Sequence, residues 1–205
     1  MLWGWACAVV GSALSVPQVV HLLATRTSAG VSPLLWQLNV ANGIGWTAHG
    51  LISGHLNVTV PNALSGLLAA LVLLLVQRDR RLPLLGTWAL PLAVGLVGVL
   101  VALLAPAGGF GVFAVVPLAI GFGDQTRDLL TSPDISGVSP VFVFGALVVQ
   151  VMWWTWAQMA GDLSIFICAS AIGLICLLNA ALWLLRHTGR LRPRVRTAAS
   201  IAEAA

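Results

Sequence analysis

Apolar residues in this chain gather in seven runs of about 20 residues, separated by short segments that hold most of its charged side chains. The runs cover residues 3–23, 33–52, 56–76, 82–105, 110–130, 141–160 and 163–185. A helix of about 20 apolar residues spans the hydrocarbon core of a bilayer. With 59% hydrophobic and 8% charged residues, the chain is predicted to be an all-α membrane protein with seven transmembrane helices.

The chain also repeats itself at an offset of 107 residues. Leu22-Leu23, Gly30-Val31-Ser32-Pro33 and Trp46 recur as Leu129-Leu130, Gly137-Val138-Ser139-Pro140 and Trp153, and residues 13–76 match residues 120–183 at 14 of 64 positions. Such self-similarity indicates two related units in one chain. The run at 82–105 belongs to neither unit, and one linking helix is what two three-helix units with the same orientation require.

The predicted arrangement is therefore a 3+1+3 parallel repeat. A first triple-helix unit occupies residues 1–77, an inner loop and the linking helix occupy 78–108, a second triple-helix unit occupies 109–186, and a basic cytoplasmic tail occupies 187–205.

Charge gives the expected orientation. The chain has no lysine, and its ten arginines are Arg26, Arg78, Arg80, Arg81, Arg127, Arg186, Arg190, Arg192, Arg194 and Arg196. All of them fall on one side if the N-terminus lies outside the cell and the C-terminus in the cytoplasm, as the positive-inside rule favours. The chain is thus expected to be a multi-pass protein of the cell (inner or plasma) membrane. Its basic tail is expected to lie against anionic lipid headgroups rather than to bind nucleic acid.

Polar residues on the second predicted helix form a stripe. Asn39, Asn42, Trp46 and His49 are spaced by three, four and three residues, which places them on one helix face. Polar side chains are costly in lipid, so this face is expected to line a cavity. The alternative is that the asparagines only hold helices together through hydrogen bonds.

Two tryptophans and an asparagine are expected to share one depth. Trp46 and Asn62 each lie about 10 to 12 Å from the turn at Gly54 along antiparallel helices. Trp153 lies equally far from the turn at Gly161, so the repeat places a second indole opposite the first, with Gln150 beside it. Indoles stack on the apolar faces of sugar rings, and an asparagine amide both donates and accepts hydrogen bonds. Trp154 and Trp156 are instead expected in an outer interfacial belt.

The first unit carries Ser15-Val16-Pro17-Gln18, then Gly30-Val31-Ser32-Pro33, then Pro61-Asn62-Ala63-Leu64-Ser65-Gly66. In this order the segments resemble a PQ-loop triple-helix unit. The double unit with its linking helix, over about 180 of the 205 residues, resembles the SWEET family of sugar transporters, whose single-unit relatives are the bacterial SemiSWEETs. The second unit departs from the pattern, because Asp124 stands at the position of Pro17 and Ala169 at that of Asn62.

The resemblance implies facilitated diffusion of a mono- or disaccharide by alternating access. It implies a sugar site near mid-membrane formed by Trp46, Asn62 and Trp153, to which the stripe adds Asn42, Asn39 and Gln150. It also implies proline hinges at Pro17, Pro33 and Pro140. Gln18 and Gln125, identical in the repeat, join the candidate gate or coupling residues.

Asp124 is the acid that the sequence places inside a predicted span, about 9 Å from its inner end. One hypothesis is that it couples transport to protons, as in some PQ-loop amino-acid exporters. The favoured interpretation is a pair with Arg127, three residues away. His21 and Asp128 are equivalent in the repeat and are expected to meet at an inner gate.

A sugar transporter is the leading functional prediction. The alternatives are a proton-coupled PQ-loop carrier of amino acids or another small solute, and a membrane receptor sharing the fold. The absence of lysine excludes a retinal photoreceptor, and no catalytic constellation predicts an enzyme, a cofactor or a metal. The expected partners are the solute and the bilayer, with homo-oligomerisation possible through Gly95 and Gly98.

Overall fold

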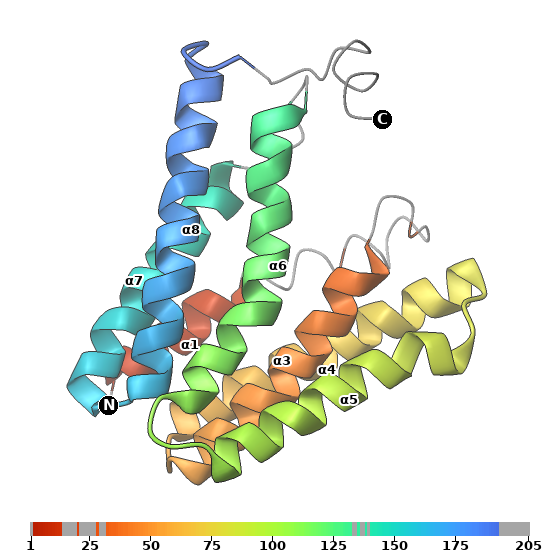
Figure 1. The fold of residues 1–205 in the computed structure, drawn as a ribbon, viewed down its shortest axis with the longest axis vertical. Helices are drawn as coiled ribbons and strands as arrows, with labels where there is room; N and C mark the ends of the chain where they lie inside the picture. The colour runs from red at the N-terminus through yellow and green to blue at the C-terminus, as the bar shows by residue number, and fades with distance from the viewer. Residues whose placement is uncertain are drawn as a thin grey trace, which may run out of the picture.

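The computed structural model describes residues 2–13, 20, 28, 32–132, 135, 138 and 140–192. Regular structure in these residues is entirely helical (Figure 1). The helices are α1 (Leu2–Ala13), α3 (Pro33–Ile52), α4 (Leu56–Arg80), α5 (Leu84–Leu104), α6 (Gly109–Thr131), α7 (Pro140–Ala160) and α8 (Leu163–His187). Every predicted apolar run therefore corresponds to a helix. Apart from the C-terminal part of the first run, which lies outside the described residues, the helix ends lie within four residues of the predicted ones.

Five of these helices are long and apolar enough to cross a membrane: α4, α5, α6, the Val143–Ala160 part of α7, and α8. The described part of α1 is apolar but shorter. Helix α3 has 20 residues, but it includes the polar side chains of Gln37, Asn39 and Asn42. The chain is a multi-pass helical membrane protein, and α3, the helix with the predicted stripe, is not among the five most apolar spans.

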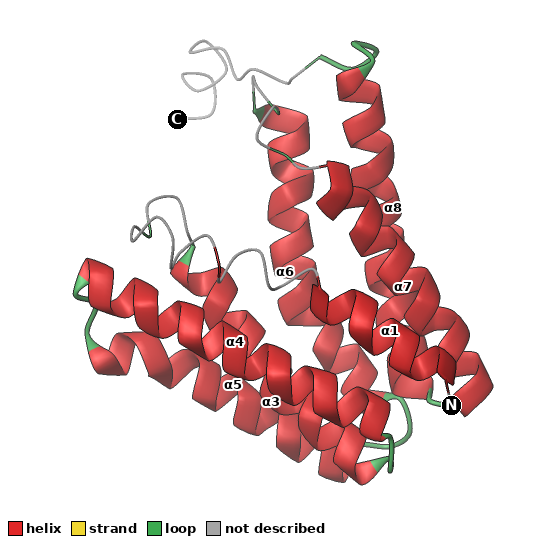
Figure 2. Cartoon of the chain, turned by 180° about the vertical axis from the view of Figure 1, so that it is seen from behind, coloured by secondary structure: helices red, strands yellow, loops and turns green. Residues whose placement is uncertain are grey.

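The helices form two groups that diverge from a shared end (Figures 1 and 2). Helix α3 packs against α4 and α5, whereas α8 packs against α6 and α7. Contacts between the groups come from α1, which lies between α4 and α7, and from α6, which touches α3 and α5. We call the shared end, with the turns at 53–55, 105–108 and 161–162, the junction end. The opposite end, with the α4–α5 turn and the C-terminal ends of α6 and α8, is the open end.

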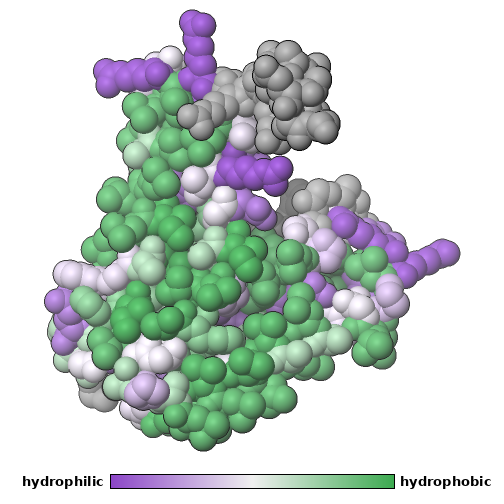
Figure 3. Space-filling view, in the orientation of Figure 1, coloured by the Kyte–Doolittle hydropathy of each residue, from purple (hydrophilic) through white to green (hydrophobic). Residues whose placement is uncertain are grey.

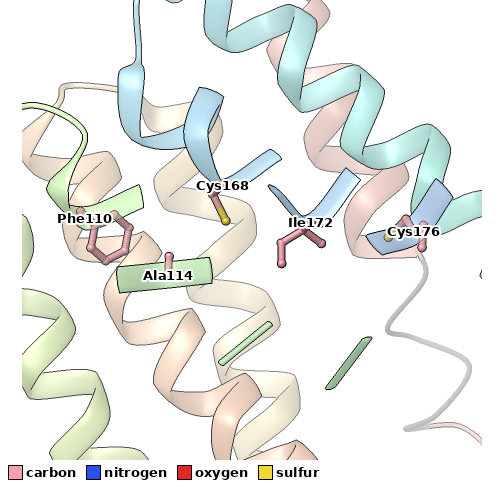
Figure 4. Close-up of a cluster of buried hydrophobic side chains, with 6 residues drawn as sticks. Phe110, Ala114, Cys168, Ile172 and Cys176 are labelled. Carbon is pink, nitrogen blue, oxygen red and sulfur yellow. The ribbon is translucent and has the colours of Figure 1, made fainter. Parts of the chain in front are cut away.

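Buried apolar clusters hold each group together. Between α6, α7 and α8 the cluster consists of Phe110, Ala114, Ala146, Cys168, Ile172 and Cys176, and Figure 4 shows the α6 and α8 side chains pointing toward one another. Apolar residues also cover much of the outer surface, as expected for a protein surrounded by lipid, whereas hydrophilic residues lie at the tips of the two groups (Figure 3).

Equivalent positions of the sequence repeat make equivalent crossings. A Cβ added at Gly4 of α1 would meet Asn57 of α4, and one added at the equivalent Gly111 of α6 would meet Ser164 of α8. The second and third helices of the units cross at Gly43 and Gly66 in one case, and at Gln150 and Gly173 in the other. Two of the contacts between groups, α1 with α7 and α6 with α3, are related in the same way.

Two expectations about surface residues are wrong. Gly95 and Gly98 do not lie on an outer face, because a Cβ added to them would meet Ile44 of α3 and Phe113 of α6, respectively. They are used for packing within the chain and are not free for a second copy. Trp156, expected in an interfacial belt, is 7% exposed and forms part of a buried cluster. Trp154 is 38% exposed.

Candidate functional site

The two groups of helices are joined at the junction end by a buried histidine and a buried acid. His49, near the end of α3, places Nε2 2.9 Å from Oδ2 and 3.2 Å from Oδ1 of Asp162. The side chains are 10% and 4% exposed. The His49 ring stacks on Phe110, the second residue of α6, with centroids 4.9 Å apart. This contact therefore combines a histidine–carboxylate hydrogen bond with an aromatic stack between the two groups.

A second cross-contact is the repeat equivalent of the first. The offset of 107 residues makes His49 equivalent to Trp156, and Asp162 equivalent to His55. His55 and Trp156 meet edge to face with ring centroids 5.0 Å apart. In both contacts a residue on the second helix of one unit touches the residue that precedes the third helix of the other. His55 also lies 3.9 Å from Asp162, so the contacts join into one cluster.

Asp162 is held in place by its position before α8. As the N-cap residue it accepts a hydrogen bond from the Ile165 N–H through Oδ1, at 2.9 Å. Burial raises the pKa of the Asp162 carboxyl, but the hydrogen bonds from His49 and Ile165 and the attraction of both histidines hold that pKa below its ordinary value. The carboxyl is consequently ionised at neutral pH.

The predicted stripe on α3 leads from this contact toward the open end. Asn42 and Asn39 are partly buried, and neither amide forms a hydrogen bond with a described residue. They lie on the helix face of His49, about 10 and 15 Å farther along. Figure 3 shows the surface hollowed between α3 and α6 on this side of the junction. Within the described residues, the two amides keep hydrogen-bonding groups that a solute or water can occupy.

Trp46 and Trp153 lie against the same buried cluster at the boundary of the two groups. Both pack against the buried cluster of Cys7, Val58, Trp156, Ala157 and Ile165. The Trp46 ring also contacts Phe110 edge to face, with centroids 4.8 Å apart, and Trp153 contacts Trp156 at 5.6 Å. Two indoles from different units therefore lie against one cluster, and their role in a sugar clamp stays a prediction. Phe110 of α6 lies beside them and was not anticipated.

Asn62 and Gln150 lie at crossings within the units. The Asn62 side chain is partly buried and donates from Nδ2 to the Val58 carbonyl of its own helix, at 2.8 Å. Its Oδ1 accepts no hydrogen bond from a described residue. Gln150 lies at the α7–α8 crossing. A Cβ added to Gly173 would be 3.6 Å from the Gln150 Cβ. The Asn62 amide nitrogen is therefore used within its own helix, and Gln150 starts from the face of α7 that packs on α8.

The acids of α6 lie on its surface. Asp124 and Asp128 are exposed, and Gln125 is partly buried. No ion pair joins Asp124 to Arg127 among the described residues, so the favoured interpretation of Asp124 is wrong. Its role in coupling remains a prediction.

The proposed hinge positions are helix starts where they are described. Pro33 and Pro140 are the first residues of α3 and α7, a position at which proline costs no hydrogen bond. Prolines inside helices are Pro61, Pro91 and Pro117. The hinge role of Pro33 and Pro140 stays a prediction. The remaining predicted residues, Pro17, Gln18 and His21, lie outside the described residues.

Sequence reasoning missed the junction contact itself. Asp162 is an acid directly before an apolar run, and the repeat pairs it with His55. That equivalence was the available signal. Asn57 was missed as well: its Nδ2 is buried beside Gly4 and Trp156 and has no hydrogen-bond partner among the described residues. Neither a known family model nor a curated protein sequence matches this chain.

Proposed function

We propose that this protein is a transporter that moves a small polar solute, specifically a sugar, across the membrane by alternating access between two triple-helix units. In this proposal α1, α3 and α4 form the first unit, α6, α7 and α8 form the second, and α5 is the linking helix. The observation that carries it is the pair of repeat-equivalent cross-contacts, His49 with Asp162 and Trp156 with His55, at one end of two groups that diverge toward the other.

The chemistry beside the junction supports a sugar as the solute. The indoles of Trp46 and Trp153 offer apolar faces on which a pyranose ring stacks. Asn42 and Asn39 each offer a donor and an acceptor that no described residue occupies. Such a wall binds neutral hydroxyl groups without requiring a charge on the solute.

The charge distribution supports an open end that faces the cytoplasm. The described arginines at 78, 80, 81, 127, 186, 190 and 192 all lie toward the open end, and the described turns of the junction end contain none. Positive charge is enriched on the cytoplasmic side of membrane proteins. The junction end would then be an outer gate, and the structure would represent the inward-open state of the cycle.

Uptake into proteoliposomes tests this proposal. The full chain is expected to take up radiolabelled glucose or sucrose, and Asn42→Ala is expected to lower the initial rate about tenfold, since an unpaired buried hydroxyl costs 1.4 kcal/mol or more. Gln158→Ala is the matched control, because that amide is exposed at the end of α7. Absence of flux for both sugars would refute the sugar assignment.

The competing proposal is a proton-coupled carrier of amino acids or another small solute. It is favoured by Asp124, an exposed carboxyl on a membrane-spanning helix with no ion-pair partner among the described residues. In the same vesicles it predicts flux that follows an imposed proton gradient and fails in Asp124→Asn. Flux that ignores the gradient removes it.

A further inference from the structure

The junction end has one cross-contact that depends on protons and one that is mainly aromatic. His49 and Asp162 attract each other by charge only while the imidazole is protonated and the carboxyl is ionised. The equivalent contact, Trp156 with His55, is edge to face and pairs one imidazole with an indole, which carries no charge. The repeat has therefore placed ionisable groups from both units at one point, within a buried cluster.

We propose that His49, His55 and Asp162 form a proton-binding site whose occupancy controls separation of the two groups of helices at the junction end. Protonation strengthens the contact and keeps this end closed, whereas loss of the proton weakens it. The site itself rests on the contacts described above. Its role as the gate of a transport cycle rests on the proposed function.

The geometry supports a proton as the ligand. Two imidazole nitrogens lie 2.9 and 3.9 Å from the same carboxylate oxygen, Asp162 Oδ2. Histidine is the side chain whose charge ordinarily changes between pH 5 and 8. The described residues contain no group of His, Cys, Asp or Glu side chains arranged to hold a metal ion.

The direction of the effect follows from which group titrates. The Asp162 pKa is lowered, so the carboxyl is ionised throughout the range in which imidazole gains its proton. In the proposal, a proton gained by either histidine adds a positive charge beside this negative one and favours the closed junction. At a pH low enough to protonate Asp162, the carboxyl loses its charge and the attraction is lost again.

Other groups around the site do not mask this response. The Ser53 hydroxyl lies 3.5 Å from His49 Nε2 and does not titrate. The neighbouring elements contribute no further charged side chain among the described residues. They present Trp46 from α3, Phe110 from α6, Trp156 from α7, Ile165 from α8, and the thiol of Cys7 from α1 in the adjacent apolar cluster.

Distance measurement between the two groups tests the proposal without any solute. Nitroxide labels at Ile52→Cys and Met159→Cys, both exposed at the ends of α3 and α7, are introduced into a chain whose native cysteines are alanine. Double electron–electron resonance is recorded in lipid nanodiscs at pH 5.5 and pH 8. The ratio of short to long distances is expected to be about fivefold higher at pH 5.5, because charged hydrogen bonds are about twice as strong as neutral ones.

Three variants separate a proton site from a merely structural contact. His49→Gln retains a donor but cannot gain a charge, and Asp162→Asn retains an N-cap but loses its charge, so both are expected to give the same distances at both pH values. His187→Gln, which alters a histidine stacked on Trp183 near the open end, is expected to keep the full response. Unchanged distances in the parent chain, or a full response in His49→Gln, would overturn the proposal.

The result is independent of the uptake assay. A pH response without sugar flux keeps the proton site and removes the sugar transporter. Sugar flux with distances that ignore pH keeps the transporter and removes the proton site.

Discussion

Gly43→Ala should destabilise the protein through the tightest helix crossing in the first unit. The added Cβ would lie 2.4 Å from Gly66 Cα, 3.0 Å from Gly66 N and 3.2 Å from Asn62 O, all backbone atoms. Backbone cannot rotate away as a side chain can, so α3 and α4 must separate by about 1 Å, and overpacking of this kind costs about 1–3 kcal/mol. For a chain of this size that corresponds to a fall in Tm of about 5 °C.

The structure supplies both the assay and the control. Cys7, Cys168 and Cys176 are 0%, 4% and 1% exposed, so a thiol-reactive fluorogenic dye reports their exposure as the protein unfolds in detergent. Gly173 is the repeat equivalent of Gly66, but a Cβ there would lie 3.6 Å from Gln150 Cβ, an ordinary contact. Gly173→Ala should therefore leave Tm unchanged or raise it by about 2 °C. Equal losses in the two variants, or no loss in Gly43→Ala, would refute this account of the crossings.

Three further predictions concern single contacts. Arg186→Gln should lower Tm by about 4 °C. The reason is that Nη1 and Nη2 donate to the carbonyls of Leu129 and Ser132, at 2.8 and 2.7 Å, at the C-terminal end of α6. An unchanged melting curve would show that these carbonyls need no cap. Asp162→Ala should melt about 2 °C below Asp162→Asn at pH 7, since alanine cannot cap α8, and equal Tm values would remove the capping role. Asn57→Leu should raise Tm by about 3 °C by removing an unpaired buried donor, and a fall would indicate a partner for that amide.

Most of the fold could be predicted from the sequence, because lipid imposes a length and an apolar composition on each span. Helix α3 begins and ends where its apolar run does, at Pro33 and Ile52. The ends that moved are those of α4 and α8, which continue to Arg80 and His187. Cationic side chains are favourable in the last turn of a helix, so the change from apolar to basic residues does not end it.

The candidate site was predictable only where one helix carries the pattern. The stripe of Asn39, Asn42, Trp46 and His49 has helical spacing, and that periodicity is visible in the sequence. The partner of His49 is not visible in this way, since Asp162 lies on another unit and only the relative placement of the units brings the two within 2.9 Å. The prediction that Gly95 and Gly98 lie on a face for a second copy was wrong for the same reason. Their spacing indicates a packing face but not which helix covers it.

In the proposed transport cycle, the repeat gives the junction end two unequal cross-contacts. Exact symmetry would make the two cross-contacts identical. One is instead a histidine–carboxylate contact, His49 with Asp162, and the other is an aromatic contact, Trp156 with His55. Beside them the Asn57 amide is left without a partner, which costs about 1–3 kcal/mol in the closed state. In the proposal above, gain or loss of one proton among His49, His55 and Asp162 shifts the population of the closed junction.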